Sequence, residues 1–246
     1  MQKTIEPAIH YWGTPVVLIS TLNENGSVNL APMSSAWWLG YSCMLGLDAS
    51  SQTTLNLKRE RECVLNLPSA DLAPQVNRLA LLTGSKSVPM HKRLLNYRFE
   101  EDKFGAAGFT AKPSLAVKPP AAAECPVQLE AVVENVHAFA ARDDKMAIPS
   151  VAVEVRIVKV HVNEEILQAN HENRINPDEW HPLIMSFRKF YGYGASVEPS
   201  RLAEGPEENY APWKFGGIKA WAAKMLSAYS RAKYAHRSEA AHESHA

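Results

Sequence analysis

Residues 29–38 read NLAPMSSAWW, and this stretch decides how the fold is interpreted. The segments around it have the apolar pattern of buried strands. Pro32 has no backbone N–H to donate to a neighbouring strand, and Ser34 and Ser35 are too small and polar to fill a core. The sequence therefore predicts a strand that interrupts its pairing here and leaves backbone amides in need of other partners.

A hairpin precedes this stretch. The run PVVLISTL at 15–22 is apolar and β-branched, as strands are. Asn25 and Gly26 follow it and form the strongest short hairpin signal, which leads into a second strand from Val28.

Four more strands are predicted further along the chain. Residues 43–49 and 63–68 predict two of them, and the polar segment 50–62 between them has neither Gly nor Pro and predicts a short helix. Residues 125–139 and 150–162 alternate apolar and polar side chains and predict two long strands. About six strands with few helices indicate a mainly β fold, an antiparallel β-barrel with peripheral helices. No G-x-G-x-x-G follows a predicted strand, so a Rossmann site is not expected.

Two interpretations of 29–38 remain open at this point. In the first, the free amides bind a planar heterocycle with carbonyl and ring-nitrogen acceptors, and Trp37 or Trp38 supplies a flat apolar wall. In the second, the stretch is a bulge at a barrel rim and both tryptophans belong to the core.

A second polar cluster lies at the start of the predicted helix. A helix N-terminus has free N–H groups and a dipole that favours an anion, so hydroxyls gathered there predict a phosphate site. The alternative is ordinary N-capping, which needs only one hydroxyl, and the acidic residue that would complete a capping box is missing. The hydroxyl residues are Ser50, Ser51, Thr53 and Thr54.

The composition excludes several classes of partner. Among 246 residues, 26 Lys and Arg balance 26 Asp and Glu, so no overall field attracts nucleic acid or an anionic membrane. The N-terminus has no apolar run typical of a secretory signal, and the longest weakly polar run, 36–47, is shorter than the ~20 residues of a membrane span. We therefore expect a cytoplasmic protein.

Neither disulfides nor metals are expected. Cys43, Cys63 and Cys125 are odd in number and lie in apolar, strand-like contexts. His171 and His181 lack the spacing of metal ligands. No hydrolase motif is present, so the sequence identifies no catalytic residues for acid–base hydrolysis.

The character of the chain changes after residue 196. A linker rich in Pro and Glu begins at 197, and a segment with Ile218, Trp221 and Met225 at helical spacing predicts an amphipathic helix followed by a frayed tail. The sequence thus predicts a main domain at 1–196 and an appended region at 197–246.

Five segments, in this order and spacing, resemble the flavin reductase family of FMN-binding split barrels, and in particular its flavoredoxin-like branch. The resemblance extends from about Tyr11 to Gly194. The segments are PVVLISTLNENGSVNLAPMSSAWW (15–38), SSQTTLNLKRERECVLNLP (50–68), DKFGAAGFTAKPS (102–114), ECPVQLEAVVENVH (124–137) and HPLIMSFRKFYGYG (181–194).

The resemblance implies a homodimer of six-stranded antiparallel split β-barrels with FMN near the interface. It implies that Ser34, Ser35, Ala36 and Trp37 lie along the isoalloxazine ring. It further implies that Lys103 reaches the flavin or its phosphate. The residues that it implies for the ribityl phosphate are Ser50, Ser51, Thr53, Thr54 and Asn56. The appended helix, and a closing strand with fewer glycines than usual, depart from the family pattern.

The leading functional hypothesis is an oxidoreductase in which NADH or NADPH delivers hydride to the flavin, which passes electrons to a small-molecule or protein acceptor. The flavin supplies this chemistry, so the sequence identifies no catalytic acid or base. One alternative is an FMN-binding electron carrier or flavin-binding module without a nicotinamide site. Another is an interaction scaffold that docks through its C-terminal helix.

Overall fold

The computed structural model describes residues 1–146, 148–201, 217–218, 221–222 and 224–230. The chain divides into two compact units, residues 1–195 and 196–246. In the second unit the described residues from 217 to 230 are helical, as the amphipathic pattern predicts. Most of the predicted linker and the whole predicted tail lie outside the described residues.

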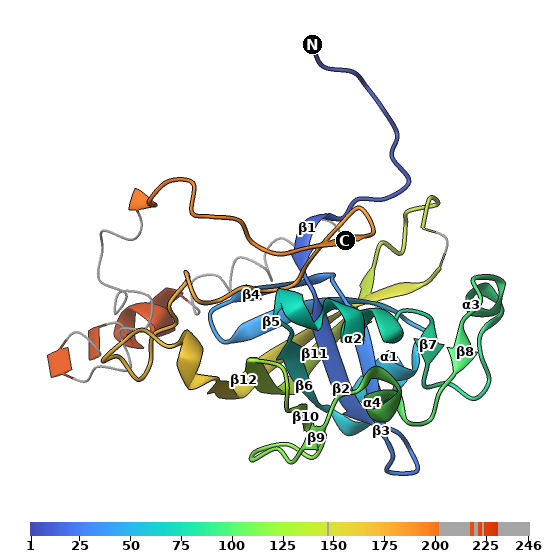
Figure 1. Cartoon of the computed structure of the whole chain (residues 1–246), viewed down its shortest axis with the longest axis horizontal. Helices are drawn as coiled ribbons and strands as arrows, with labels where there is room; N and C mark the ends of the chain where they lie inside the picture. Colours follow the sequence, from blue (N-terminus) through green and yellow to red (C-terminus); the bar gives the residue numbers. More distant parts are fainter. Residues whose placement is uncertain (147, 202–216, 219–220, 223, 231–246) are drawn as a thin grey trace. The chain divides into compact units, whose positions relative to one another are not determined.

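The first unit is organised around one antiparallel sheet of seven strands (Figure 1). In spatial order these are β3 (Val28–Met33), β2 (Val17–Leu22), β6 (Glu62–Leu67), β11 (Val127–Phe139), β12 (Ser150–Val162), β5 (Ser42–Asp48) and β4 (Ala36–Leu39).

Smaller elements surround this sheet. The helices are α1 (Gln52–Glu60), α2 (Ala73–Arg78), α3 (Met90–Leu94) and α4 (Lys103–Ala107), with 3₁₀ turns at Ala70–Leu72 and Glu164–Ile166. A second sheet contains β1 (Trp12–Pro15), β13 (Ile184–Ser186) and β14 (Lys189–Tyr191). Two-residue strands form two more pairs, β9 (Ala111–Lys112) with β10 (Ala121–Ala122), and β7 (Leu82–Thr83) with β8 (Arg98–Phe99).

The break at Ser34 and Ser35 explains why the main sheet of the predicted split barrel has seven strands and not six. It divides one predicted strand into β3 and β4, which lie at opposite edges of the sheet. Pro32 is on the edge strand β3, where a missing N–H is tolerated. The carbonyl of Ser35 accepts a hydrogen bond of 2.7 Å from the amide of Gly46. Only two residues join the two edges, so the sheet must curl, but no ladder closes it between β3 and β4 in the described chain.

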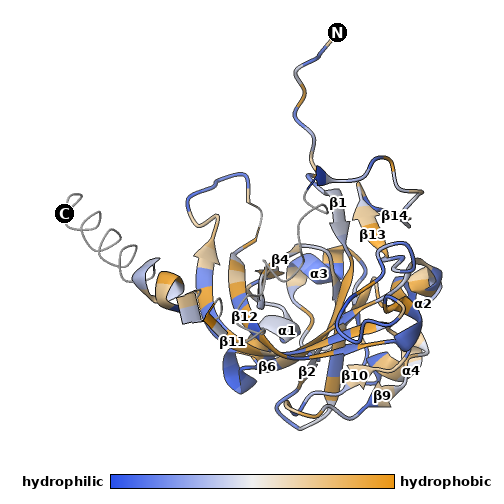
Figure 2. Ribbon diagram, turned by 90° about the vertical axis from the view of Figure 1, so that its left-hand side faces the viewer, coloured by the Kyte–Doolittle hydropathy of each residue, from blue (hydrophilic) through white to orange (hydrophobic). Residues whose placement is uncertain are grey.

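The two longest strands supply the curvature. The ladder between β11 and β12 shifts register twice, between Glu130 and Ala131 and between Val133 and Asn135. Such bulges bend a strand and increase its twist. Figure 2 shows the resulting curved sheet, with α1 on its inner side.

Alternate residues of the sheet build two cores. Val17 and Ile19 of β2 belong to an inner cluster that includes Leu57 of α1. Val16 and Leu18, which point to the other face, pack in a second cluster with residues of α2 and α4. The sheet is therefore covered on both faces at β2, and the helices are fixed close to the Ser34–Ser35 break.

Candidate functional site

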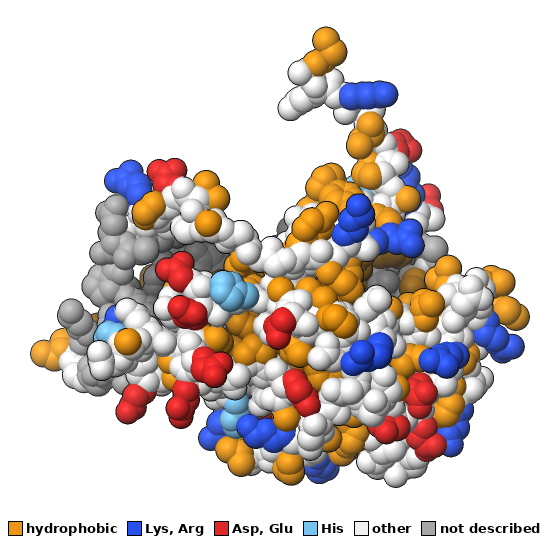
Figure 3. Space-filling view, in the orientation of Figure 1, with side chains coloured by type: hydrophobic (Ala, Val, Ile, Leu, Met, Phe, Trp, Pro, Cys, Tyr) orange, Lys and Arg blue, Asp and Glu red, His pale blue; other side chains and the backbone are white. Residues whose placement is uncertain are grey.

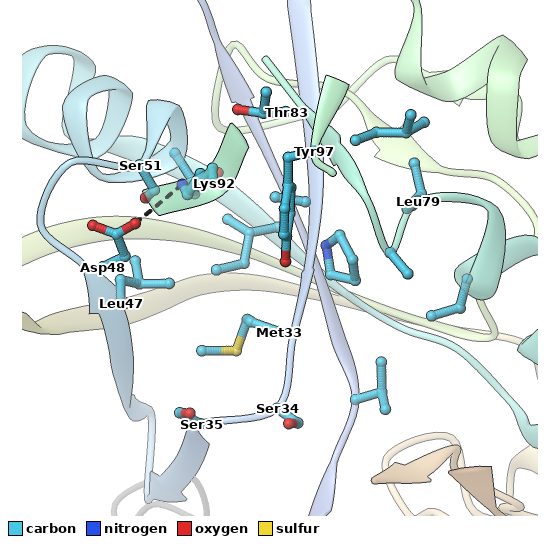
Figure 4. A pocket seen from close by; sticks show the side chains of 18 of the residues that line it. Met33, Ser34, Ser35, Leu47, Asp48, Ser51, Leu79, Thr83, Lys92 and Tyr97 are labelled. Carbon is cyan, nitrogen blue, oxygen red and sulfur yellow. Dashed lines mark ion pairs between the residues drawn. The ribbon is translucent and has the colours of Figure 1, made fainter. Parts of the chain in front are cut away.

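A cavity of about 620 Å³ lies between the break in the sheet, the start of α1 and the segment that carries α3. This volume falls in the range of roughly 300–1,000 Å³ that small-molecule sites have. Figure 4 shows Asp48, Ser51 and Lys92 together at one end, Ser34 and Ser35 at the other, and Tyr97 and Met33 between them.

The start of α1 has both a capping role and a place in the cavity wall. Ser51 is the N-cap, and its Oγ accepts a hydrogen bond of 3.1 Å from the amide of Thr54. The Thr54 hydroxyl donates to the Asp48 carbonyl at 2.8 Å, and the Ser50 hydroxyl donates to Asp48 Oδ1 at 2.7 Å. Three of the four clustered hydroxyls therefore stabilise the turn into the helix, and of these three only Ser51 also lines the cavity.

Thr53 belongs to a buried chain of polar contacts that ends at a lysine. Its Oγ1 accepts from Asn29 Nδ2 at 3.0 Å, and Asn29 Oδ1 accepts from Lys103 Nζ at 3.3 Å. All three residues are buried and line the cavity. Gly84 is beside them, and a Cβ there would lie only 2.5 Å from Asn29 Oδ1, so this wall requires glycine.

Lys103 is the most unusual charge in the cavity. It is 2% exposed, and no carboxylate lies within ion-pair distance of it among the described residues. Burial, and secondly repulsion from Lys92, lowers its pKa to about 7. An ammonium has three N–H donors, and Asn29 uses one. The site is therefore short of an anionic partner for Lys103.

A second lysine reaches the cavity from α3 and does have a carboxylate partner. Lys92 Nζ and His91 Nε2 each lie 3.1 Å from Asp48 Oδ2. Burial alone would raise the pKa of Asp48, but hydrogen bonds from Ser50 and the contact with Lys92 lower it below its ordinary value. With both oxygens occupied, Asp48 positions α3 against the end of β5.

Hydroxyl-bearing residues and a close backbone approach form the opposite end of the cavity. The hydroxyls of Ser35 and Tyr11 are 3.2 Å apart, and a Cβ on Gly46 would lie 3.1 Å from Ser35 Cβ, so the backbones approach closely there. Burial, then the nearby Asp48 and Tyr11, raises the pKa of Tyr97 above its ordinary value.

The structure brings half of the predicted site residues to the cavity. Ser34, Ser35, Ser51, Thr53 and Lys103 line it. Those outside the lining are Ala36, Trp37, Ser50, Thr54 and Asn56.

Each of the residues outside the lining has another environment. Ala36 packs in the inner core, and Trp37, next to it on β4, is 57% exposed. Trp38 packs at the margin of the inner core, so only one of the two tryptophans fits the rim-and-core interpretation. The buried Asn56 donates to Thr21 Oγ1 and to Asn23 Oδ1, both at 2.9 Å, and thereby fastens α1 to the hairpin.

Sequence reasoning missed the cavity residues Asn29, Asp48, His91, Lys92 and Tyr97. Asp48 meets α3 across more than forty positions of sequence, a contact that no periodicity signals. The basic run at 91–93 was the only available signal. Among the described residues, no group of three or more His, Cys, Asp or Glu could hold a metal ion. No helix in the same part of the chain is long and apolar enough to cross a membrane.

A curled sheet whose two edges meet at a strand break defines a split-barrel protein. Residues 9–194 match the family described as flavin reductase like domain, and the chain belongs to that family. The uncharacterized protein YdfE of Bacillus subtilis is 40% identical over 195 residues, which is 79% of this chain and 91% of that protein.

Solved structures share the fold at low sequence identity. Flavoredoxin of Desulfovibrio vulgaris is 18% identical and superposes with a TM-score of 0.66, covering 83% of this chain and all of that one. An FMN-binding domain of a flavin reductase-like enzyme from Shewanella baltica is 14% identical, with a TM-score of 0.54 and coverage of 76% and 90%.

Proposed function

We propose that the cavity binds FMN and that the protein is a flavin oxidoreductase that takes electrons from NADH or NADPH and passes them to a further acceptor. The observation that carries this proposal is Lys103, a buried cation without a carboxylate partner in the described chain, in a cavity large enough for a flavin. Membership of the flavin reductase-like family supports it.

The cationic end of the cavity fits the flavin phosphate. Lys103 and Lys92 both reach it and are close enough for Lys92 to depress the pKa of Lys103, while a single carboxylate, Asp48, partners Lys92. The N-terminus of α1 adds free backbone N–H groups at Gln52 and Thr53, where the dipole favours an anion. A phosphate monoester carries a charge of about −1.5 to −2, which matches this excess of positive charge.

The other end fits the flavin ring system. Met33 and Tyr97 supply apolar surface. Ser34 and Ser35 lie where the sheet interrupts its ladder, so their backbone amides are available to a heterocycle. The chain at this point runs from β3 to β4 and is held by Gly46. We therefore assign ring contacts to Ser34 and Ser35 and no ring contact to Trp37.

The flavin supplies the chemistry of this proposal. A bound flavin would supply a two-electron acceptor for the hydride of a reduced nicotinamide, with the second proton from water and oxidised nicotinamide as the product. The protein's own residues bind and orient. Asp48 holds α3, Asn29 holds Lys103, and the Thr53 hydroxyl holds Asn29.

We also propose that the protein is a homodimer with the flavin near its interface. Trp37 and Leu39 are alternate residues of the edge strand β4, and both expose most of their side chains. Figure 3 shows hydrophobic side chains gathered across the middle of one face of the molecule. An exposed apolar surface on an edge strand favours association, and a symmetric pair is the commonest solution. Trp37→Ser should shift the mass measured by light scattering from dimer to monomer, whereas a monomeric wild-type protein would refute the dimer.

The test of the main proposal separates binding from reaction. We expect apo-protein to bind FMN at least about tenfold more tightly than riboflavin, because the phosphate forms charge-assisted hydrogen bonds. The FMN-loaded protein should then bleach at the flavin absorbance band when NADH or NADPH is added without oxygen. Equal affinity for FMN and riboflavin would refute the phosphate site. Tight FMN binding without bleaching by either donor would favour an electron carrier or flavin-binding module.

A further inference from the structure

A second hollow lies on the other side of the segment that carries α3. It is a hollow of about 630 Å³ lined by Lys86, Ser87, Val88 and Arg93. Lys86 and Arg93 are exposed and have no acidic partner among the described residues. The whole stretch 84–99 contains four Lys and Arg residues and no Asp or Glu, although the chain as a whole is neutral. Two of these four cations, Lys86 and Arg93, line the hollow, which therefore carries positive charge.

The two cations are held in place. Arg93 Nε donates to the Val88 carbonyl at 3.1 Å, which leaves the terminal guanidinium nitrogens free to bind a ligand. Lys86 Nζ lies 5.9 Å from the centre of the Phe99 ring, a cation–π distance. The Ser85 hydroxyl donates to the Ser87 carbonyl at 2.9 Å and fixes the turn between them.

The segment from Lys86 to Tyr97 is a wall shared by the hollow and the flavin cavity. Consecutive residues of α3 serve the two sides. Lys92 lines the flavin cavity and contacts Asp48, whereas Arg93 lines the hollow. Asp48 fixes the relative placement of the two sites because it anchors α3 through both His91 and Lys92. Figure 1 places α3 beside β7 and β8 at the margin of the unit.

We propose that this hollow binds the 2′-phosphate of the reduced dinucleotide, so that the protein prefers NADPH to NADH. This inference rests on the proposed oxidoreductase function. We place the nicotinamide in the flavin cavity and the remote end of the donor at the hollow, because consecutive residues of α3, Lys92 and Arg93, line the two sites. A terminal phosphate monoester places up to two negative charges on one group, which two cations can share. The pyrophosphate is common to both donors and spreads its charge over two phosphates, so it fits a two-cation hollow less well.

Two measurements test the site, and one does not need a reaction. Calorimetry should show that adenosine 2′,5′-bisphosphate binds FMN-loaded protein at least about tenfold more tightly than adenosine 5′-monophosphate, because charged groups hydrogen-bond strongly to phosphate. Anaerobic flavin reduction should show a kcat/KM for NADPH that exceeds that for NADH by a similar factor.

The double variant Lys86→Gln with Arg93→Gln should bind the two adenosine probes with equal affinity. It should also show equal kcat/KM values for NADPH and NADH. The control is Arg98→Gln with Lys112→Gln, which changes the net charge equally at exposed residues outside the hollow and should keep both differences. FMN titration of each variant verifies that the flavin cavity is intact.

The outcomes separate this inference from the proposed function. Equal binding of the two adenosine probes to the wild-type protein would overturn the 2′-phosphate site whatever the activity. An equal loss of activity with NADH and NADPH in the double variant would assign the hollow to the pyrophosphate and also overturn it. If neither donor reduces the flavin, the oxidoreductase function fails, and the adenosine probes still decide whether the hollow recognises a 2′-phosphate.

Discussion

Two lysines reach the same cavity from different elements, and their surroundings differ. Lys92 comes from α3, and its charge is partnered by the Asp48 carboxylate at 3.1 Å. Lys103 begins α4 and is almost fully buried, and within the described part of the chain its one hydrogen-bond partner is the Asn29 amide oxygen at 3.3 Å. The first lysine stabilises the empty fold by holding α3. The second destabilises it, and such a charge is retained where a ligand supplies the missing partner.

Removing the charge of Lys103 and breaking the ion pair of Lys92 should therefore have opposite effects on apo stability, and the larger effect is expected at Lys103. Lys103→Met should raise the free energy of unfolding of the apo-protein by an amount on the order of a few kcal/mol at pH 7, because a buried charge is replaced by an apolar side chain of similar length. Thermal melts of the apo-protein measure this change. Lys112→Met, on an exposed part of β9, is the matched control and should leave stability nearly unchanged. A large loss of apo stability in Lys103→Met would show that Lys103 is structural.

Breaking the ion pair of Lys92 should lower the stability of the apo-protein, the opposite of the effect at Lys103. Asp48→Asn leaves Lys92 and His91 without their shared carboxylate and should lower apo stability by about 1–2 kcal/mol, because the pair is only partly exposed. It should also accelerate FMN release, since α3 is held less firmly over the cavity. Urea titration and stopped-flow fluorescence measure the two effects. Unchanged stability and release in Asp48→Asn would refute its role as the anchor of α3.

The contribution of Lys103 to apo stability should depend on pH. The pKa of Lys103 in the fold is about 7, below its ordinary value of 10.5, so the unfolded chain binds the extra proton between these values. Its contribution to apo stability should therefore rise with pH from about 7 to 10.5 and should be constant below that window.

Binding should have the opposite pH dependence. An anion binds the protonated lysine, so FMN affinity should fall as pH rises from 7 to 9 while riboflavin affinity does not. Lys103→Met should remove this dependence. FMN and riboflavin affinities that change in parallel with pH would show that another group titrates.

The smallest effects concern the hydroxyls of α1. Ser51→Ala removes the N-cap and should lower apo stability by ~1 kcal/mol. Thr53→Ala removes the nearer of the two hydroxyls, Thr53 and Thr21, that accept from the Asn29 amide. Because Asn29 orients Lys103, the substitution should weaken FMN binding by about 1 kcal/mol. Melting curves without FMN measure the loss of apo stability, and the further shift with saturating FMN measures the loss of FMN affinity. An FMN-induced shift that is unchanged in Thr53→Ala would show that the Thr53 hydroxyl supports only the fold and not FMN binding.

The sequence allowed the local elements to be predicted but not the long-range contacts. The hairpin at Asn25-Gly26 and the strand break at Ser34 are confirmed, because turn chemistry and a missing donor act within a few residues. Which way Trp37 faces depends on how β4 joins the opposite edge of the sheet, and the meeting of Asp48 with α3 depends on tertiary packing. No local sequence pattern indicates either contact. The extra strand has the same origin, since one predicted strand serves both edges.

Lys103 is buried beside a cavity where the phosphate of a flavin would supply its missing anionic partner. The most direct measurement is a cycle of four dissociation constants, for FMN and riboflavin with wild-type protein and with Lys103→Met, by flavin fluorescence. We expect the substitution to weaken FMN binding by about 2–3 kcal/mol, roughly 30- to 150-fold, and to leave riboflavin binding nearly unchanged. An equal loss for both flavins, or no loss for either, would contradict the claim.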